Sequence, residues 1–395
     1  DRWQRIAGKA PMRAFQKIVQ LAIEKSVDAV LLTGDVYTSA NHNLTAQLDY
    51  VRLLHKLGQH QIPVFAVLGN HDPAESWKAR IAFPPNVHVF STEKVERMPL
   101  LVDGEEVAAI YGQSYARSEQ RENVAWNFHK SPVDPFAIGM LHTQAGQTQS
   151  TYAPCTLTDL QESGMDYWAL GHVHKHRILS ENPYIVYSGN PQGLDCTETG
   201  ERGCYLVEVG SYGTVTMQFI DTSIVRWETV DIAMDDIQSV TELRDAVRLE
   251  KEKVRRETGK PTFLTVRFVG SGSMYQVINN PEATQYWIES WNEEEEGKYA
   301  FVMVQGLRNL ARPKIDSGER SKLPDTVGDY LSVAEKLEAL PEEERMKVLR
   351  DIVMSRPEFE RLGAYGRSIS DERLREAFAK GKWLGMQKLL DDKRG

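Results

Sequence analysis

The stretch DAVLLTGD, residues 28–35, sets the fold of the first part of the chain. Its apolar residues are typical of a buried strand, which leads through a Thr-Gly turn to the carboxylate of Asp35. Before it, apolar residues recur at helical spacing from Phe15 to Ile23. A helix followed by a strand predicts one unit of a layered α/β domain.

Three further predicted strands also end in polar residues. These strands cover residues 64–68, 136–141 and 167–170. The polar residues that follow them are Asn70, His71 and Asp72, then His142, and then His172 and His174. Because α/β sheets carry their sites at the carboxyl ends of their strands, we expect one site built from these turns.

The length of 395 residues suits two or three domains. We expect residues 1–225 to form the layered α/β domain, because predicted strands continue to about that point. The order of helices and strands predicts a small α+β accessory domain over residues 226–312. Residues 313–395 have helical spacings without strand signals and predict a linker and a helical tail. Four successive glutamates at 293–296 are typical of a solvated loop.

Composition narrows the class of protein. The net charge of −9 argues against a general surface for polyanions, so any contact with nucleic acid is local or shared with a partner. No apolar run reaches the roughly 18 to 20 residues of a membrane-spanning helix, and the first residues lack the apolar core of a secretory signal. We therefore expect a cytoplasmic protein without membrane association. Three cysteines without a CxxC pair argue against a thiolate zinc site.

Aspartate, asparagine and histidine side chains after separate strands form a donor set for divalent metals. The set is Asp35, Asn70, His142, His172 and His174. Oxygen and imidazole donors suit manganese, magnesium, iron or zinc with exchangeable water positions. Two ions roughly 3.5 to 4 Å apart stabilise the attacking and leaving oxygens of a phosphate ester, and one carboxylate, here Asp35, could bridge both. The spacing alone does not decide which ion His172 and His174 each bind.

His71 directly follows one of these ligands, close enough to meet a substrate phosphate. Imidazole donates a proton to a leaving oxygen near neutral pH, so His71 is the candidate catalytic acid, and Asp72 is the candidate partner that orients it. Lys175, His176 and Tyr187 are candidate substrate contacts, Tyr187 as an aromatic platform for bases. Each of these three also fits a simpler role on the surface or in packing.

Four motifs resemble those of the calcineurin-like metallophosphoesterase family. They are LLTGDVYTS at 31–39, VLGNHDP at 67–73, IGMLHTQAG at 138–146 and WALGHVHKH at 168–176. YGQSYA at 111–116 and YSGNPQGLD at 187–195 are similar to the SbcD-type DNA repair nucleases within that family, including a YhaO-like bacterial branch. The resemblance covers about residues 14–190 and implies a layered β-sandwich flanked by helices.

The resemblance also implies a ligand arrangement, with manganese as the expected metal. Asp35 would bridge two ions, Asn70, His142 and His172 would complete one, and His174 would belong to the other. The first strand of the family ends in Asp-x-His, which adds two ligands to the ion of His174. The printed sequence begins Asp-Arg-Trp instead, and we expect a segment before it to carry that motif.

These features predict a metal-dependent DNA phosphodiesterase, a DNA repair exonuclease or endonuclease subunit that uses a metal-activated water. By the same resemblance we expect an SbcC-like ATPase as a partner of the tail, and a homodimer formed with the helix near residues 44–57. Two alternatives remain open at this point. One is an enzyme for nucleotides or other small phosphoesters, and the other is a catalytically impaired scaffold subunit for such an ATPase.

Overall fold

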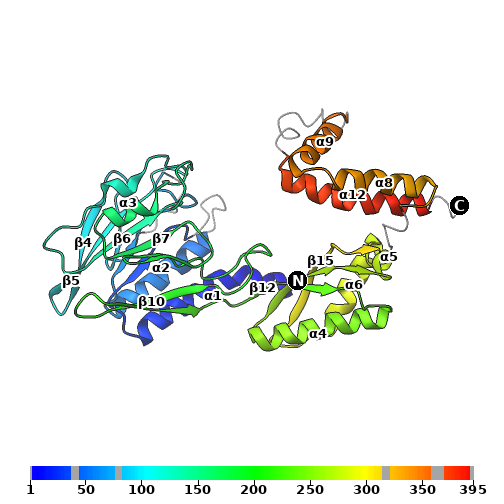
Figure 1. Ribbon diagram of the computed structural model, residues 1–395. Coiled ribbons are helices and arrows are strands. Elements are labelled where there is room, and N and C mark those ends of the chain that lie inside the picture. The colour runs from blue at the N-terminus through cyan, green and yellow to red at the C-terminus, as the bar shows by residue number, and fades with distance from the viewer. Residues whose placement is uncertain (1, 37–43, 76–81, 314–320, 357–368, 392–395) are drawn as a thin grey trace. The chain divides into compact units, whose positions relative to one another are not determined.

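The structure is a computed structural model, and it describes residues 2–36, 44–75, 82–313, 321–356 and 369–391 (Figure 1). Asp1, where the sequence starts, lies outside the described residues. The chain divides into two units. The first contains residues 1–229, 251–265 and 295–305, and the second contains residues 230–250, 266–294 and 306–395. Because the chain passes from one unit to the other several times, domain limits at 225 and 312 stay a prediction.

Two sheets form the centre of the first unit. A parallel three-stranded sheet has the order β1-β2-β3, with β1 Val30–Leu32, β2 Val64–Ala66 and β3 Val87–Val89. A mixed six-stranded sheet has the order β4-β5-β6-β7-β9-β8. Its strands are β4 Glu96–Val102, β5 Glu105–Gln113, β6 Ala137–His142, β7 Tyr167–Gly171, β8 Arg177–Glu181 and β9 Tyr184–Tyr187. Strands β5, β6, β7 and β9 run parallel, so their carboxyl ends meet at one edge.

Alternating side chains bury the six-stranded sheet on both faces. Leu141 of β6 packs in one core with Trp168 of β7, while Met140, the neighbour of Leu141, packs in a second core with Phe65 of β2. This alternation is the period of two that a strand requires. The second core therefore joins the two sheets face to face, with side chains of the hairpin β10 Gly203–Val209 and β11 Val215–Asp221 packed at its border.

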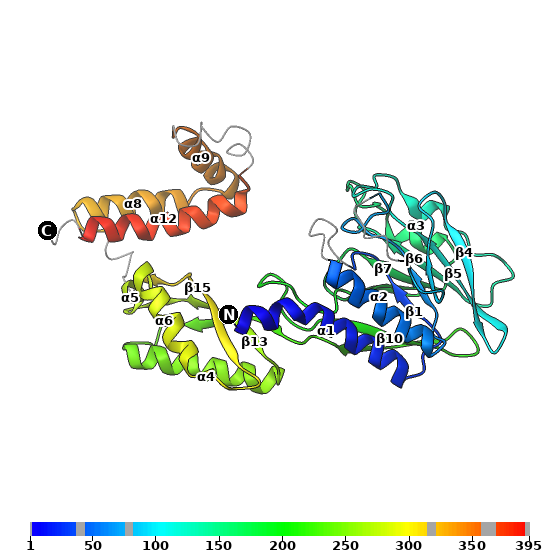
Figure 2. The same cartoon turned by 180° about the vertical axis from the view of Figure 1, so that it is seen from behind.

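Helices cover the outer faces of this sandwich. α1 Arg2–Glu24 and α2 Leu44–Gln59 lie side by side (Figures 1 and 2), and Val19 and Leu54 pack with Val64 of the three-stranded sheet. The short helices η2 Val124–Asn127 and α3 Leu157–Glu162 cover the six-stranded sheet, where Leu160 meets Trp168. The order of helices, sheet, sheet and helices confirms the predicted layered α/β sandwich.

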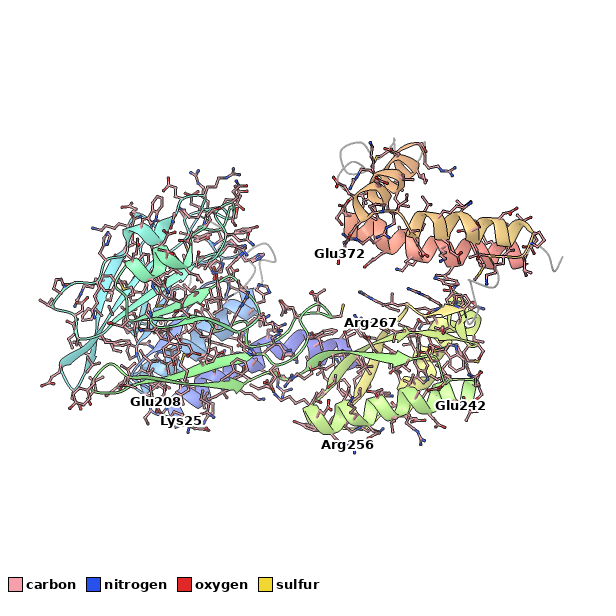
Figure 3. The ribbon with its side chains drawn as sticks, viewed as in Figure 1. Lys25, Glu208, Glu242, Arg256, Arg267 and Glu372 are labelled. Atoms are coloured by element: carbon pink, nitrogen blue, oxygen red, sulfur yellow. The ribbon has the colours of Figure 1, made fainter. Side chains whose placement is uncertain are left out.

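The chain after residue 225 forms a third sheet and two groups of helices. This sheet has the order β12-β13-β15, with β12 Arg226–Ala233, β13 Thr262–Val269 and β15 Val302–Asn309, and a short pair joins β14 Ser271–Gly272 to β16 Arg312–Pro313. The helices between the strands are α4 Val240–Thr258, α5 Tyr275–Ile278 and α6 Pro281–Glu293. Glu242 in the first turn of α4 and Arg256 in its last turn complement the helix dipole (Figure 3).

In the described residues, the predicted tail consists of three helices joined by turns and irregular segments. Its helices are α8 Thr326–Glu338, α9 Glu342–Met354 and α12 Asp371–Asp391. Leu331 of α8 packs with Trp383 of α12, and Met346 of α9 packs with Leu374 of α12. No described helix combines the length and the apolar character that crossing a membrane requires.

The glutamate run at 293–296 differs from the expected solvated loop. Glu295 is 1% exposed, lies 2.9 Å from both Lys251 and Arg255, and accepts the backbone N–H of Val302 at 2.8 Å. The sequence does not distinguish Glu295 from the exposed glutamates beside it, because its burial depends on the cations that it pairs with in the fold. The carboxylate is therefore a buried partner for Lys251 and Arg255 and also pairs with Lys298 at 3.3 Å.

Candidate metal centre

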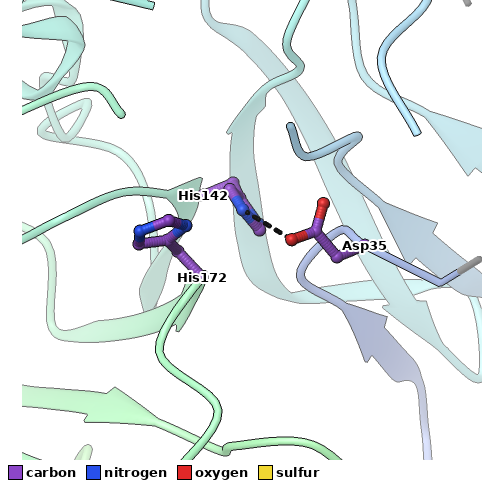
Figure 4. A group of neighbouring side chains, drawn as sticks. All are labelled: Asp35, His142 and His172. Atoms are coloured by element: carbon purple, nitrogen blue, oxygen red, sulfur yellow. Dashed lines mark ion pairs between the residues drawn. The ribbon is translucent and has the colours of Figure 1, made fainter. Parts of the chain in front are cut away.

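Side chains at or just after the ends of three separate strands converge at the carboxyl ends of the central strands. Asp35 follows β1, His142 ends β6 and His172 follows β7. One ligand atom from each lies within 4.8 Å of the other two, and Figure 4 shows the three side chains close together, with His142 facing Asp35. The sequence predicted this convergence from the positions of the residues after strands.

The hydrogen bonds of His142 leave one ring nitrogen available for a cation. Its Nδ1 lies 2.9 Å from the carbonyl oxygen of Thr33, and since a carbonyl only accepts, Nδ1 carries the proton. In the neutral ring, Nε2 then presents a lone pair, 2.9 Å from Oδ1 of Asn70 and 3.2 Å from Oδ2 of Asp35. That Asp35 oxygen is buried and has no hydrogen bond of acceptable geometry among the described residues. Lone pairs that face one another in this way fit a bound cation.

His172 completes this group from the other side. Its Nδ1 lies 3.1 Å from Oδ1 of Asn70, and its Nε2 lies 3.0 Å from Oε1 of Gln144. The ring packs on Tyr152, with centroids 4.5 Å apart. Burial lowers the pKa of His172 to about 4, so the imidazole is neutral at neutral pH, as a metal ligand must be.

The carboxylate of Asp35 is held in its ionised form. Burial raises its pKa, but the neighbouring side chain of His142 and the backbone N–H of His71 outweigh that effect, and the pKa lies below its ordinary value. Its other oxygen accepts the backbone N–H of His71 at 2.7 Å. The carboxylate of Asp35 therefore has one oxygen fixed by the turn after β2 and one that faces the histidines.

Asp72 fastens the turn after β1 to the turn after β2. Its side chain is 1% exposed, and its carboxylate accepts the backbone N–H groups of Gly69 (2.8 Å), Asp35 (3.1 Å) and Val36 (3.0 Å). Burial raises its pKa in spite of these donors. Asp72 therefore positions the backbone of Asp35, while its predicted hydrogen bond to the ring of His71 stays a prediction.

Close backbone approaches bring the turns together. A Cβ on Gly171 would lie 1.9 Å from the carbonyl oxygen of Thr33, and one on Gly69 would lie 2.3 Å from Oδ1 of Asp35. Asp35 (φ 57°) and His172 (φ 97°) both have left-handed backbone, which non-glycine residues rarely adopt. Such strain persists where the surrounding structure imposes it, and it gathers at functional sites.

Two predicted residues lie beside this group. His71 follows Asn70 in the turn after β2 and is exposed, and its role as a proton donor stays a prediction. His174 is 47% exposed at its side chain, and its Nδ1 is paired with Oε1 of Glu198. This pairing raises the pKa of His174, and it leaves Nε2 as the ring nitrogen directed away from Glu198.

The structure gives the predicted substrate contacts three different surroundings. Lys175 is exposed, as a contact with phosphate requires. The ring of His176 packs on Phe219 at a centroid distance of 3.9 Å, so this residue has a packing role and its contact with substrate stays a prediction. Tyr187 corrects the expectation of an aromatic platform. It is 2% exposed, and its hydroxyl donates to the carbonyl of Thr143 and accepts the N–H of Ala145, so no base can stack on it.

Sequence reasoning missed three groups that hold the histidine rings. They are the carbonyl of Thr33, the side chain of Gln144 and the carboxylate of Glu198. A backbone carbonyl has no sequence signal. Gln144 lies two residues after His142 within a quoted motif, which was a usable signal, whereas Glu198 lies 24 residues from His174 and had none.

Comparisons with known proteins agree with this geometry. The chain matches the family model for calcineurin-like phosphoesterases over residues 8–176. It is 36% identical over 294 residues to the uncharacterized metallophosphoesterase YhaO of Bacillus subtilis, which covers 73% of this chain and 71% of that protein. It is 25% identical over 337 residues to the DNA double-strand break repair protein Mre11 of Sulfolobus acidocaldarius, covering 80% of this chain and 83% of that protein. The protein of the same name from Haloferax volcanii is 26% identical over 280 residues, covering 68% of this chain and 61% of that protein.

The family match covers the turns that carry Asp35, Asn70, His142, His172 and His174. Members of the family bind divalent metals, and the group of Asp35, His142 and His172 is a candidate site for one. By its sequence and its fold, the chain belongs to the calcineurin-like phosphoesterase family of metal-dependent phosphoester hydrolases.

Proposed function

We propose that the protein is a metal-dependent DNA phosphodiesterase of the SbcD and Mre11 type. The observation that carries this proposal is the convergence of Asp35, His142 and His172 on one point, with the exposed His71 beside it. Relatives named as Mre11 DNA double-strand break repair proteins support DNA as the substrate, because one of them matches 80% of the chain. The match extends beyond the residues of the family model.

Two divalent ions, manganese by preference, would be held by five side chains. Asp35, Asn70, His142 and His172 would hold one, and Asp35 together with His174 would contribute to the other. The nitrogen and oxygen donors fit such metals, and the facing lone pairs of His142, Asn70 and Asp35 support the first position. Bound ions of this kind polarise a phosphoryl oxygen and lower the pKa of water.

The residues of the chain supply position and a proton. The turn after β2 presents His71 next to Asn70, so its imidazole would donate a proton to the sugar oxygen that leaves the phosphorus. Asp72 keeps this turn in register with Asp35 through its three backbone hydrogen bonds. Lys175, exposed beside His174, would meet a neighbouring phosphate of the strand.

Partners are part of the same proposal. The tail helices expose Val333 (57%), Ile352 (45%) and Leu384 (45%), apolar side chains that an SbcC-like ATPase could cover. Deleting residues 325–395 should abolish co-purification with such a subunit, and unchanged binding would refute this docking role. Helix α2 exposes Leu44 (50%) and Leu48 (46%), one helical turn apart, which supports a homodimer through this face. We also propose that the protein and this ATPase subunit lie in the cytoplasm.

Cleavage of end-labelled single- and double-stranded DNA with added Mn²⁺ tests the function. A small phosphodiester serves as the competing substrate, and His71→Ala is the test variant. His60→Ala is its matched control, because His60 is an exposed histidine in the turn after α2. We expect the wild-type protein and His60→Ala to cut DNA, and His71→Ala to lose about 10²- to 10⁴-fold in rate. Cleavage of the small ester without cleavage of DNA would overturn the DNA assignment.

A further inference from the structure

The segment after β9, residues 188–202, lies against His174, and its residues have no part in the reaction described above. It contains most of the motif YSGNPQGLD, whose first residue ends β9. Because β9 runs parallel to β7, this segment leaves the sheet at the same edge as the turn that carries His174. A Cβ on Gly189 (φ 72°) would lie 2.8 Å from the carbonyl oxygen of His174, so the two backbones touch.

Hydrogen bonds fix the backbone of His174 to this segment. The N–H of Asn190 donates to the carbonyl oxygen of His174 at 3.0 Å. The guanidinium of Arg202 donates to the same carbonyl, to Oδ1 of Asn190 at 3.2 Å and to the carbonyl of Thr199 at 3.1 Å. Arg202 is 5% exposed, so these contacts are sheltered from water.

The carboxylate of Glu198 then fixes the ring. Its Oε1 pairs with Nδ1 of His174, while its Oε2 accepts from Nδ2 of Asn190 at 2.8 Å and from the backbone N–H of Leu194 at 2.7 Å. Its side chain is 12% exposed. All three partners are donors, and only a carboxylate has acceptors on both sides to satisfy them.

We propose that Glu198 is a positioning residue that holds the His174 imidazole with its proton on Nδ1 and presents Nε2 to a divalent cation. The inference rests on the proposed metal centre and names how one of its ligands is oriented. A carboxylate behind a histidine ligand fixes the ring orientation and makes the opposite nitrogen a better donor. In this proposal, residues of the motif at 187–195 hold Glu198 and the backbone of His174 in place.

Replacing Glu198 by glutamine gives a sharp prediction because the amide has one acceptor and one donor. If its NH₂ faces Asn190 and Leu194, the amide of Asn190 and the backbone N–H of Leu194 lose their acceptor and face another donor. If its NH₂ faces His174 instead, the ring must accept at Nδ1 and carry its proton on Nε2, which removes the lone pair offered to the metal. Either arrangement weakens metal binding.

The test measures Mn²⁺ affinity by titration calorimetry on the full chain without DNA. We expect Glu198→Gln to weaken binding by about 10- to 100-fold. Glu201→Gln is the matched control on the same segment, since Glu201 is 59% exposed and pairs with Arg226. We expect this control to bind Mn²⁺ like the wild-type protein. Equal losses in the two variants would overturn the proposal.

A double-mutant cycle separates positioning from general damage to the fold. If Glu198 acts through His174, then adding Glu198→Gln to His174→Ala should cause no further loss of Mn²⁺ affinity. A full additional loss would contradict the proposal, as would unchanged affinity in His174→Ala. If Glu198→Gln lowers the melting temperature, Glu198→Asp provides a second comparison. Aspartate keeps the negative charge on a shorter side chain, so Glu198→Asp should retain more Mn²⁺ affinity than Glu198→Gln. Because the Mn²⁺ titration contains no DNA, its outcome does not depend on whether the protein cleaves DNA. The role of Glu198 and the proposed function can therefore fail separately.

Discussion

Replacing Gly171 by alanine should push apart the turns after β1 and β7, which carry Asp35 and His172 of the candidate metal centre. The added Cβ would lie 1.9 Å from the carbonyl oxygen of Thr33, whereas ordinary contacts begin at 3.4 Å. The turns after β1 and β7 would therefore have to separate by about 1.5 Å, since the atom met at 1.9 Å is a backbone oxygen. The same carbonyl accepts from Nδ1 of His142, so the change also disturbs that ring.

Two magnitudes follow from this displacement. Forcing extra volume into a packed site costs about 1 to 3 kcal/mol, which lowers the melting temperature by about 2 to 12 °C for a unit of this size. A misplacement of roughly 1 Å in the ligands weakens function by about 100-fold. We expect losses of both stability and Mn²⁺ affinity in Gly171→Ala.

Scanning calorimetry and Mn²⁺ titration measure the two effects. Gly8→Ala is the control, because a Cβ on Gly8 in α1 meets nothing within 4 Å. This control should bind Mn²⁺ normally and gain up to about 1 kcal/mol of stability from its better helix propensity. Wild-type affinity in Gly171→Ala would refute the close contact between the two turns.

Three other predictions concern carboxylates. Asp35→Ala should lose both Mn²⁺ binding and turnover, because it removes the shared ligand; full metal occupancy measured by titration would show that the assignment is wrong. Asp72→Asn should lower the free energy of unfolding by about 1 to 3 kcal/mol in a denaturant titration, because an amide cannot accept on both sides; unchanged stability would contradict the three backbone bonds. Asp159, which accepts from Thr156, Trp126 and Asn123, has a pKa held at about 2, since these hydrogen bonds outweigh burial. Its contribution to stability is therefore complete above about pH 4 and lost as the pH falls toward 2, so the difference between wild type and Asp159→Asn should shrink over that range; a constant difference would be inconsistent with this pKa.

Local sequence was sufficient to place the candidate ligands at the ends of strands. Asp35 and His142 each follow an apolar run, and parallel strands deliver their carboxyl ends to one edge whatever the details of packing. Helix α2 was also predicted close to its observed bounds, since it is a single periodic run. These features need only short-range patterns.

Features that depend on distant partners could not be predicted. Glu198 becomes informative only when β9 brings its segment beside the turn of His174. Tyr187 was a candidate platform for bases, yet its side chain is buried and its hydroxyl donates to the carbonyl of Thr143. Glu295 is buried because Lys251 and Arg255 lie opposite it, a pairing that the glutamate run itself does not contain.

The most direct test of the metal centre is an anomalous difference map from crystals of the protein soaked in Mn²⁺. We predict a peak bounded by Asp35, Asn70, His142 and His172, within coordination distance of Nε2 of His142 and Nδ1 of His172. A map with no peak there, or with manganese bound only elsewhere on the chain, would contradict the proposed site.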